Sequence, residues 1–199
     1  MPPRVNQYIQ GGHYHIYNRG VSRQPIFQSH ENYLYLLRLI KRIAAECSIS
    51  ILAYCLLPNH YHLLLRQDGD TPAGKVPTRV FNSYTQAYNL ATKRSGVLFE
   101  SRYQMIHIET DEYLHLLCRY IHCNPVRHGL VASLEEWPYS NYLEWIELRS
   151  GTLVDREFIH THFGTTQQYH AYVTSYLRGE VVLPAGLQNY LARVEGGAG

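Results

Sequence analysis

The stretch SISILAYCLLPNHYHLLLRQ, residues 48–67, constrains the possible folds of this chain most strongly. Two runs rich in β-branched and other apolar residues flank the dipeptide Pro58-Asn59, which is a turn signal. Two such runs joined by a short turn are typical of a β-hairpin. Because both runs are apolar, other elements must cover the sheet that the hairpin begins.

A strand and a helix are expected before this hairpin. Residues 11–18 alternate around Tyr14 and Ile16, and this alternation predicts a strand. Residues 31–47 carry apolar side chains at the spacing of an amphipathic helix. Ser29 is the expected N-cap of that helix, because its hydroxyl can accept a hydrogen bond from the first turn.

Three segments follow the hairpin, and they are a helix over 78–96, a strand over 101–109 and a helix over 110–123. Gly96 is the expected C-cap of the first helix, because glycine adopts the left-handed conformation without strain. Thr110 or Asp111 is expected to cap the second helix, and Pro125 is expected to end it.

The resulting order, β-α-β-β-α-β followed by a helix, predicts an α+β protein with a ferredoxin-like, split β-α-β antiparallel sheet. At 199 residues the chain suits one domain. From about Val131 on, we expect Trp- and Tyr-rich turns with two or three short helices. The expected organisation is a main domain over 8–131 and a helical C-terminal extension over 132–199 that packs on it, with the closing EGGAG frayed.

Composition excludes several classes of protein. No apolar run is long enough to cross a membrane and the N-terminus lacks a signal-peptide core, so we expect a cytoplasmic protein with no membrane partner. The four cysteines form no CxxC pair, which favours free thiols over disulfides or a zinc site. A formal net charge of +2 permits a nucleic-acid partner without arguing for one.

The histidines of PNHYHLLL are the first candidate functional residues. His60 and His62 are two apart on a predicted strand, so both imidazoles point to one face while Tyr61 points to the other. Two parallel imidazoles can bind one divalent cation. A pair of hydrogen-bonded histidines at a sheet surface is the preferred explanation of an isolated HxH motif, and a third ligand elsewhere is needed to favour a metal.

The helix predicted over 110–123 supplies a candidate third ligand close to its end. Tyr120 and Asn124 are four residues apart and therefore lie on the same helical face. An amide oxygen of Asn124 could complete a His-His-amide site and bring the phenol of Tyr120 beside it. Such a neutral set of nitrogen and oxygen ligands suits Mg²⁺ or Mn²⁺. A packed helix tyrosine is the simpler explanation of Tyr120 when it is considered alone.

Five motifs together resemble the single-tyrosine transposases of the HUH superfamily, and within them the REP-associated tyrosine transposases. The motifs are HYHIYNRG (13–20), LPNHYHLLL (57–65), GVLFESRYQ (96–104), DEYLHLLCRYIHCNPVRHGLV (111–131) and WPYSNY (137–142). They occur in the family's order, and the resemblance extends over roughly residues 8–145. His128 departs from the family pattern, which commonly has a small residue there.

The resemblance implies a role for each candidate residue. It implies that His60 and His62 bind a divalent metal, Mg²⁺ or Mn²⁺, and that Asn124 contributes to the same site. Tyr120 is then the nucleophile that forms a 5′-phosphotyrosine link with DNA, on the helix after the fourth strand. His128 is expected to lie outside the metal set. His15 is expected either to support the metal-binding histidines or to pack in the core.

The resemblance also implies the partner, which is single-stranded or hairpin-forming DNA of the REP type. The protein would act on it as a monomer or a homodimer. Basic side chains are the expected phosphate and base contacts, and the candidates are Arg19, Arg23, Arg79, Lys93, Arg94, Arg102 and Arg127. Each of them is otherwise an ordinary solvated charge.

Three other functions compete with strand transfer. An RNA-recognition module has the same order of elements, but its central strands need projecting aromatics where this chain has HYHLLL. A metallohydrolase that activates water would need carboxylate ligands near the histidines, and none is adjacent in sequence. A domesticated relative that binds DNA without cutting it has all the residues above and stays open.

Overall fold

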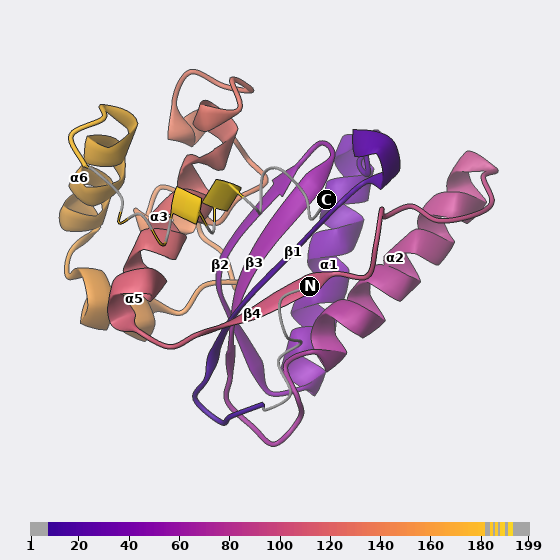
Figure 1. Ribbon diagram of the computed structural model, residues 1–199, viewed down its shortest axis with the longest axis horizontal. Coiled ribbons are helices and arrows are strands. Elements are labelled where there is room, and N and C mark those ends of the chain that lie inside the picture. Colours follow the sequence, from indigo (N-terminus) through magenta and orange to yellow (C-terminus); the bar gives the residue numbers. More distant parts are fainter. Residues whose placement is uncertain (1–7, 182–183, 185, 187, 190, 193–199) are drawn as a thin grey trace.

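A computed structural model describes residues 8–181, 184, 186, 188–189 and 191–192. Its elements are β1 (His13–Arg19), η1 (Val21–Arg23), α1 (His30–Glu46), β2 (Ile49–Leu57), β3 (His60–Gln67), α2 (Lys75–Thr92), β4 (Gln104–Ile108), α3 (Asp111–Arg127), η2 (Leu134–Glu136), α4 (Tyr142–Trp145), α5 (Arg156–Phe163) and α6 (Thr166–Leu177). The predicted order β-α-β-β-α-β followed by a helix is confirmed (Figure 1).

The four strands form one antiparallel sheet in the order β2-β3-β1-β4, which is the ferredoxin-like arrangement expected from the sequence. The predicted hairpin is present, with Leu57 paired to His60 across the turn. β1 and β3 are the central strands, and their register pairs Tyr17 with His62. Both histidines of the HxH motif therefore belong to a central strand rather than to an exposed edge.

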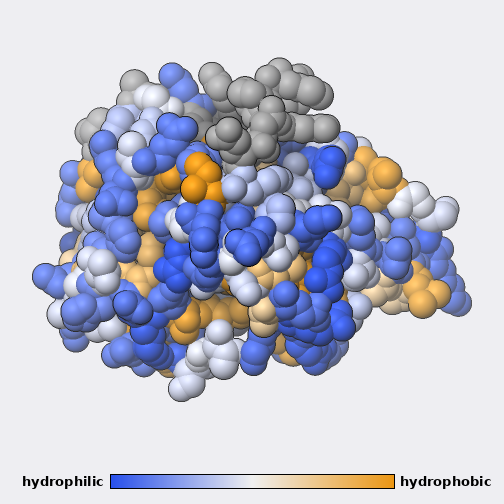
Figure 2. All heavy atoms as spheres, turned by 90° about the horizontal axis from the view of Figure 1, so that it is seen from below, coloured by the Kyte–Doolittle hydropathy of each residue, from blue (hydrophilic) through white to orange (hydrophobic). Residues whose placement is uncertain are grey.

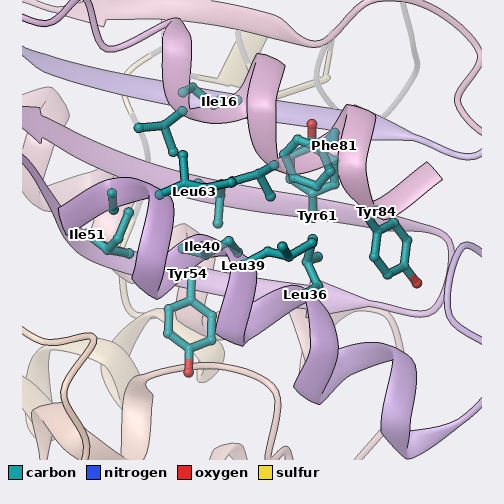
Figure 3. Packing of buried hydrophobic residues seen from close by; sticks show 14 of the residues in the cluster. Ile16, Leu36, Leu39, Ile40, Ile51, Tyr54, Tyr61, Leu63, Phe81 and Tyr84 are labelled. Carbon is teal, nitrogen blue, oxygen red and sulfur yellow. The ribbon is translucent and has the colours of Figure 1, made fainter. Parts of the chain in front are cut away.

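Helices cover both faces of the sheet (Figure 1). α1 and α2 lie on one face, where the side chains of β3 that alternate with the histidines enter their core (Figure 3). The ring of Tyr61 stacks on Phe81 of α2 with centroids 3.9 Å apart. α3 lies on the opposite face and packs against apolar residues such as Leu64 of β3. The alternation of β3 thus sends Tyr61, Leu63 and Leu65 into one core and turns the face with the histidines and Leu64 toward α3.

Three predicted helix ends are wrong, and the first is the start of α2, which begins at Lys75 rather than at Thr78. α2 ends at Thr92 with Lys93 in the left-handed conformation (φ 54°), and Gly96 follows three residues later at φ 94°. α3 continues through Pro125 to Arg127. A proline in the last turn removes only its own N–H group, and the turn still closes through the His128 N–H, which donates to the Asn124 carbonyl at 2.9 Å.

The predicted N-caps are confirmed for both helices. Ser29 precedes α1 in an extended conformation, and its backbone N–H donates to the side chain of Asn32 at 3.3 Å. Thr110 rather than Asp111 caps α3, and its hydroxyl accepts from the Tyr113 N–H at 3.3 Å. The Thr110 cap fixes the start of α3, the helix that carries the candidate nucleophile.

The WPYSNY segment covers the exposed edge of β2. The Leu56 N–H donates to the Tyr139 carbonyl at 2.9 Å, and the Trp137 indole N–H donates to the Leu56 carbonyl at 3.1 Å. A β-bridge between Cys55 and Ser140 extends this pairing. An unpaired edge strand is a site of unwanted strand pairing, so this segment completes the sheet on that side.

Asn141 holds the segment in place through its side chain. The amide is fully buried, and its Oδ1 accepts from the Tyr54 N–H at 2.8 Å. Its Nδ2 donates to the carbonyls of Leu52 and Leu153 at 2.8 and 3.1 Å. The same Oδ1 lies 2.9 Å from Nε2 of His122, which belongs to α3. One amide therefore connects β2, α3 and the chain that follows α3.

The elements after α4 pack on the outer side of α3. Tyr169 and Val173 of α6 are fully buried in the same apolar cluster as Ile121 of α3. The buried guanidinium of Arg119 lies between the rings of Tyr172 and Tyr176, with its Cζ 4.4 and 4.7 Å from their centroids. The EGGAG segment lies outside the described residues.

The remaining expectations from composition concern the thiols and membranes. All four cysteines are free and buried, as predicted. None of the helices within the described part of the chain is long and apolar enough to cross a membrane.

We expect Asn141→Ala to lower the free energy of unfolding by about 3 kcal/mol, because it leaves several buried backbone groups without a partner. Urea denaturation followed by circular dichroism measures the change. Asn82→Ala, at an exposed position of α2, is the matched control and should change stability by less than about 0.5 kcal/mol. Equal stability of the two variants would contradict the role given to Asn141.

Candidate active site

His60 and His62 project from the first residues of β3 toward α3. Their rings are 5.2 Å apart between centroids and nearly perpendicular. Burial, followed by the nearby His128 and Arg19, lowers the pKa of His60 to about 3. Burial and the neighbouring His60 and His15 also lower the pKa of His62 well below its usual value. Both imidazoles are therefore neutral at pH 7, the state in which histidine binds a metal.

Hydrogen bonds to the other ring nitrogens orient both histidines. Nδ1 of His60 lies 2.7 Å from Oδ1 of Asn59, and an amide oxygen can only accept, so this ring nitrogen donates. Nδ1 of His62 lies 3.1 Å from Nε2 of the fully buried His15. The structure thus shows His15 in contact with the histidine pair, which was one of its two expected roles. In the tautomer in which Nδ1 of His62 donates to His15, Nε2 of His62 carries the lone pair that a metal ion needs.

Asn124 presents an amide oxygen from α3. The residue is fully buried, and its Nδ2 donates to the Tyr120 carbonyl at 2.8 Å, which fixes the orientation of the amide. Its Oδ1 is buried without a hydrogen-bond partner, and so is Nε2 of His62. Buried polar atoms are rarely left unsatisfied. A nitrogen and an oxygen in this state are the donor types that a divalent cation would need.

Tyr120 lies against the histidine pair, one helical turn before Asn124. Its ring is 5.4 Å from the His62 ring and nearly perpendicular to it. The guanidinium of Arg127 lies over the Tyr120 ring with its Cζ 5.2 Å from the centroid. Tyr120 is only 1% exposed, so its side chain is closed off from solvent in this structure.

The structure therefore brings Tyr120 of α3 against His62 of β3, with Asn124 one helical turn further along α3. Among the described residues, the usual metal-binding side chains form no separate site. Within the part of the chain that the structure describes, no three His, Cys, Asp or Glu side chains gather in a way that could hold a metal. The candidate metal site thus needs the amide of Asn124, and the carboxylate ligands of a metallohydrolase are not present around the histidines among the described residues.

Two neighbours of the site were not expected from the sequence. The ring of His128 lies 5.0 Å from that of His60, so it adjoins the histidine pair although we expected it away from the metal set. Tyr17 lies 6.2 Å from the His62 ring and stacks on His15 at 5.0 Å. Tyr17 follows His15 by two residues on one strand face, and this spacing is a signal that the sequence already contained.

Of the basic residues expected to bind DNA, two lie directly at the site. Arg19 is paired across the sheet with His60, and its guanidinium forms an ion pair with Glu100 at 3.0 Å. Arg127 contacts the Tyr120 ring as described above. Arg23 is exposed nearby, where its carbonyl accepts from the Asn59 side chain at 3.2 Å.

The other four basic residues are spread over the surface. Arg79 forms an ion pair with Glu46 at the end of α1. The guanidinium of Arg102 lies 5.6 Å from the Tyr103 ring. Lys93 and Arg94 lie just beyond the end of α2. The structure therefore does not gather the seven candidates into one patch.

Stability should depend on pH through the buried histidines. Burial is the main cause that lowers the pKa of His15 to about 3 and that of His122 to about 4, from about 6.5 when unfolded. At pH values between the folded and the unfolded pKa, the unfolded chain therefore binds more protons than the folded one. The stabilisation is complete above pH 6.5 and is lost as the pH falls toward 4.

We expect the free energy of unfolding to fall as the pH is lowered from 7 to 5, because unfolding takes up protons on these histidines. Near pH 5 the slope should correspond to an uptake of at least about two protons. Urea denaturation at several pH values, in the presence of a chelator, measures this slope. An unchanged free energy across the range would show that these imidazoles are not buried in the neutral form.

Strand transfer to a tyrosine needs a phenol within reach of groups that can hold a phosphate and a metal ion. The fold brings a tyrosine of α3 against a histidine of β3, although the two elements are distant in sequence. The fold agrees with the resemblance to single-tyrosine transposases. In agreement, the family model described as "Transposase IS200 like" matches residues 8–124. The chain belongs to the IS200-like transposase family.

A relative with a similar sequence supports this family assignment. A protein of Haemophilus influenzae named as a REP-associated tyrosine transposase is 31% identical over 117 residues, which are 51% of this chain and 64% of that relative. The match thus spans less than two thirds of the relative's length. The resemblance to REP-associated tyrosine transposases is confirmed.

A solved structure shows the same fold. It is described as a REP-associated tyrosine transposase bound to a REP hairpin, and it superposes with a TM-score of 0.63 at 21% identity. The superposition covers 78% of this chain and 94% of the other.

Proposed function

We propose that this protein cleaves and rejoins single-stranded or hairpin DNA through a covalent link to Tyr120, with a bound Mg²⁺ or Mn²⁺. The observation that carries the proposal is the position of the Tyr120 ring, 5.4 Å from the His62 ring and one turn from the buried amide of Asn124. A packed helix tyrosine needs neither a histidine pair nor an unsatisfied amide oxygen beside it.

The proposed substrate is DNA that is unpaired at the cleaved phosphate. The Tyr120 phenol lies between a helix and a sheet, and a single strand enters such a space more readily than a duplex does. Tyr17 offers a half-exposed ring near the histidines on which a base could stack. Hairpin DNA is supported by the structural relative, which is described as bound to a REP hairpin. The protein would act in the cytoplasm, as a monomer or a homodimer.

The covalent step exchanges one phosphodiester bond for another. The Tyr120 oxygen attacks the phosphorus and loses its proton, the bond from phosphorus to the 3′ oxygen breaks, and that oxygen takes up a proton as a 3′-OH. The product is a 5′-phosphotyrosine. Attack by a second 3′-OH reverses the step and joins strands without another energy source. Since only about one free tyrosine in a thousand is ionised at pH 7, positioning of the phenol is essential.

His60, His62 and Asn124 are the residues that would hold the metal ion. When bound there, a divalent ion supplies charge that polarises the scissile phosphate and stabilises the departing 3′ oxygen. The protein's own contribution is orientation. Asn59 and His15 fix the two imidazoles through their Nδ1 atoms, so that each ring presents its other nitrogen.

A second candidate function is DNA binding without cleavage, as in a domesticated relative. The observation that favours it is the burial of Tyr120, which is 1% exposed. The two functions differ in one product, because only strand transfer leaves DNA covalently attached to the protein.

We expect Tyr120→Phe to abolish the covalent adduct with a 3′-labelled oligonucleotide in the presence of Mn²⁺, since phenylalanine lacks the attacking oxygen. Denaturing gel electrophoresis measures the adduct. Tyr17→Phe removes the other phenol near His62 and should leave the adduct in place. An adduct in Tyr120→Phe would exclude this nucleophile, and its absence from the wild-type protein would favour DNA binding without cleavage.

We expect His62→Ala and Asn124→Ala each to weaken Mn²⁺ binding strongly, and His15→Ala to weaken it by about 10- to 100-fold because it supports His62. Titration of Mn²⁺ followed by electron paramagnetic resonance measures free ion directly and needs no activity. His107→Ala, on β4, is the control and should bind as the wild type does. If His62→Ala binds Mn²⁺ normally, the proposed ligand set is wrong.

A further inference from the structure

The turn that follows α2 has an unusual surface. We name residues 89–97 the α2 tip. Leu90 and Val97 are 83% and 69% exposed, and they are the two most exposed large apolar side chains among the described residues. In Figure 2 the corresponding lobe projects at the right of the molecule and carries hydrophobic residues beside hydrophilic ones. Single exposed apolar residues are common, but two on one projecting turn suggest a contact surface.

Hydrogen bonds give the α2 tip a defined turn conformation. Lys93 closes α2 in the left-handed conformation, and the Arg94 N–H donates to the Asn89 carbonyl at 2.9 Å. The Asn89 side chain donates to the Gly96 carbonyl at 2.9 Å and spans the turn. These bonds keep the exposed apolar side chains of Leu90 and Val97 and the basic side chains of Lys93 and Arg94 on one turn.

The charge of this region favours a polyanion. Residues 71–99 contain four Lys or Arg residues and no Asp or Glu. Arg79 is compensated by Glu46 at the other end of the helix. Within the described chain, neither Lys93 nor Arg94 forms an ion pair with a carboxylate. A second copy of this surface would bring like charges together, so a nucleic acid fits it better than self-association does.

The tip is connected to the sheet end that carries the histidine pair. The Leu98 carbonyl accepts from the Val21 N–H at 3.0 Å, and the Glu100 N–H donates to the Arg19 carbonyl at 3.0 Å. Arg19 in turn is paired with His60. α2 nevertheless lies on the face opposite α3 (Figure 1). A nucleotide held at the histidine pair therefore cannot also contact the tip, and only DNA that continues around the sheet end can do so.

We propose that the α2 tip binds the folded hairpin stem that adjoins the cleaved strand. Lys93 and Arg94 contact its phosphates, and Leu90 and Val97 pack against its sugars and base edges. This assignment rests on the proposed function, because it presupposes that DNA occupies the histidine site. It adds a contact that distinguishes a hairpin from an unpaired strand.

The test compares two DNAs and three double variants. One DNA is a fluorescein-labelled oligonucleotide with a paired stem and a 5′ single-stranded extension, and the other is an unpaired oligonucleotide of equal length. The variants are Lys93→Ala with Arg94→Ala, Leu90→Ser with Val97→Ser, and the control Lys41→Ala with Arg42→Ala. Lys41 and Arg42 are exposed on α1, and their replacement by alanine removes the same charge as the replacement of Lys93 and Arg94. Fluorescence anisotropy gives the affinity at several salt concentrations.

We expect the charge variant at the tip to weaken hairpin binding about tenfold and to lower the salt slope by about 2, since two phosphate contacts are lost. The apolar variant should weaken hairpin binding without changing the slope. Neither should affect the unpaired strand, and the control should bind both DNAs as the wild type does. Unchanged thermal midpoints verify folding, which is expected because the substituted side chains lie at the surface.

Other outcomes overturn the assignment. Tip variants that bind the hairpin normally, or that lose affinity equally for both DNAs, exclude a stem contact. A change in oligomeric state with normal hairpin binding would make the tip an interface between copies of the chain. The proposed function is judged separately, because the tip variants retain Tyr120 and should still form the covalent adduct on the unpaired strand.

Discussion

The packing of α3 against the histidine-bearing face of the sheet is the contact on which the rest of the site depends. A strand alternates its side chains, so β3 can give Tyr61 to the core beneath α1 and α2 and still present His60 and His62 on the other face. That second face is polar at its centre. Only a helix that supplies matching polar groups can cover it, and α3 does so with Tyr120 and Asn124.

The chain after α3 holds this helix in position. The WPYSNY segment completes the β2 edge, and Asn141 within it contacts both β2 and His122 of α3. On the outer side, α6 places Tyr176 against Arg119, and the ring of Tyr176 lies 5.8 Å from the guanidinium of Arg127. Arg127 in turn covers Tyr120. A segment with no chemistry of its own thereby determines how deeply the candidate nucleophile is buried.

Much of the fold was predictable because local periodicity is strong. The order of elements, the hairpin around Pro58-Asn59 and both helix N-caps follow from spacing and capping rules. The errors occur at helix ends, where several local solutions have similar energies. α2 starts earlier than expected, at Lys75, and Lys93 rather than Gly96 is its C-cap. Pro125 is accommodated because its missing N–H belongs to the final turn of α3.

The sequence by itself determined which residue types are available, and the spacing of two on a strand and four on a helix determined that each pair shares a face. It could not determine how the two faces meet. The contacts of His128 with His60 and of Tyr17 with His62, and the burial of Tyr120, all arise between segments distant in the chain. They depend on the register of β1 with β3 and on the docking of α3, and these are set by the packing of the whole core rather than by any local pattern.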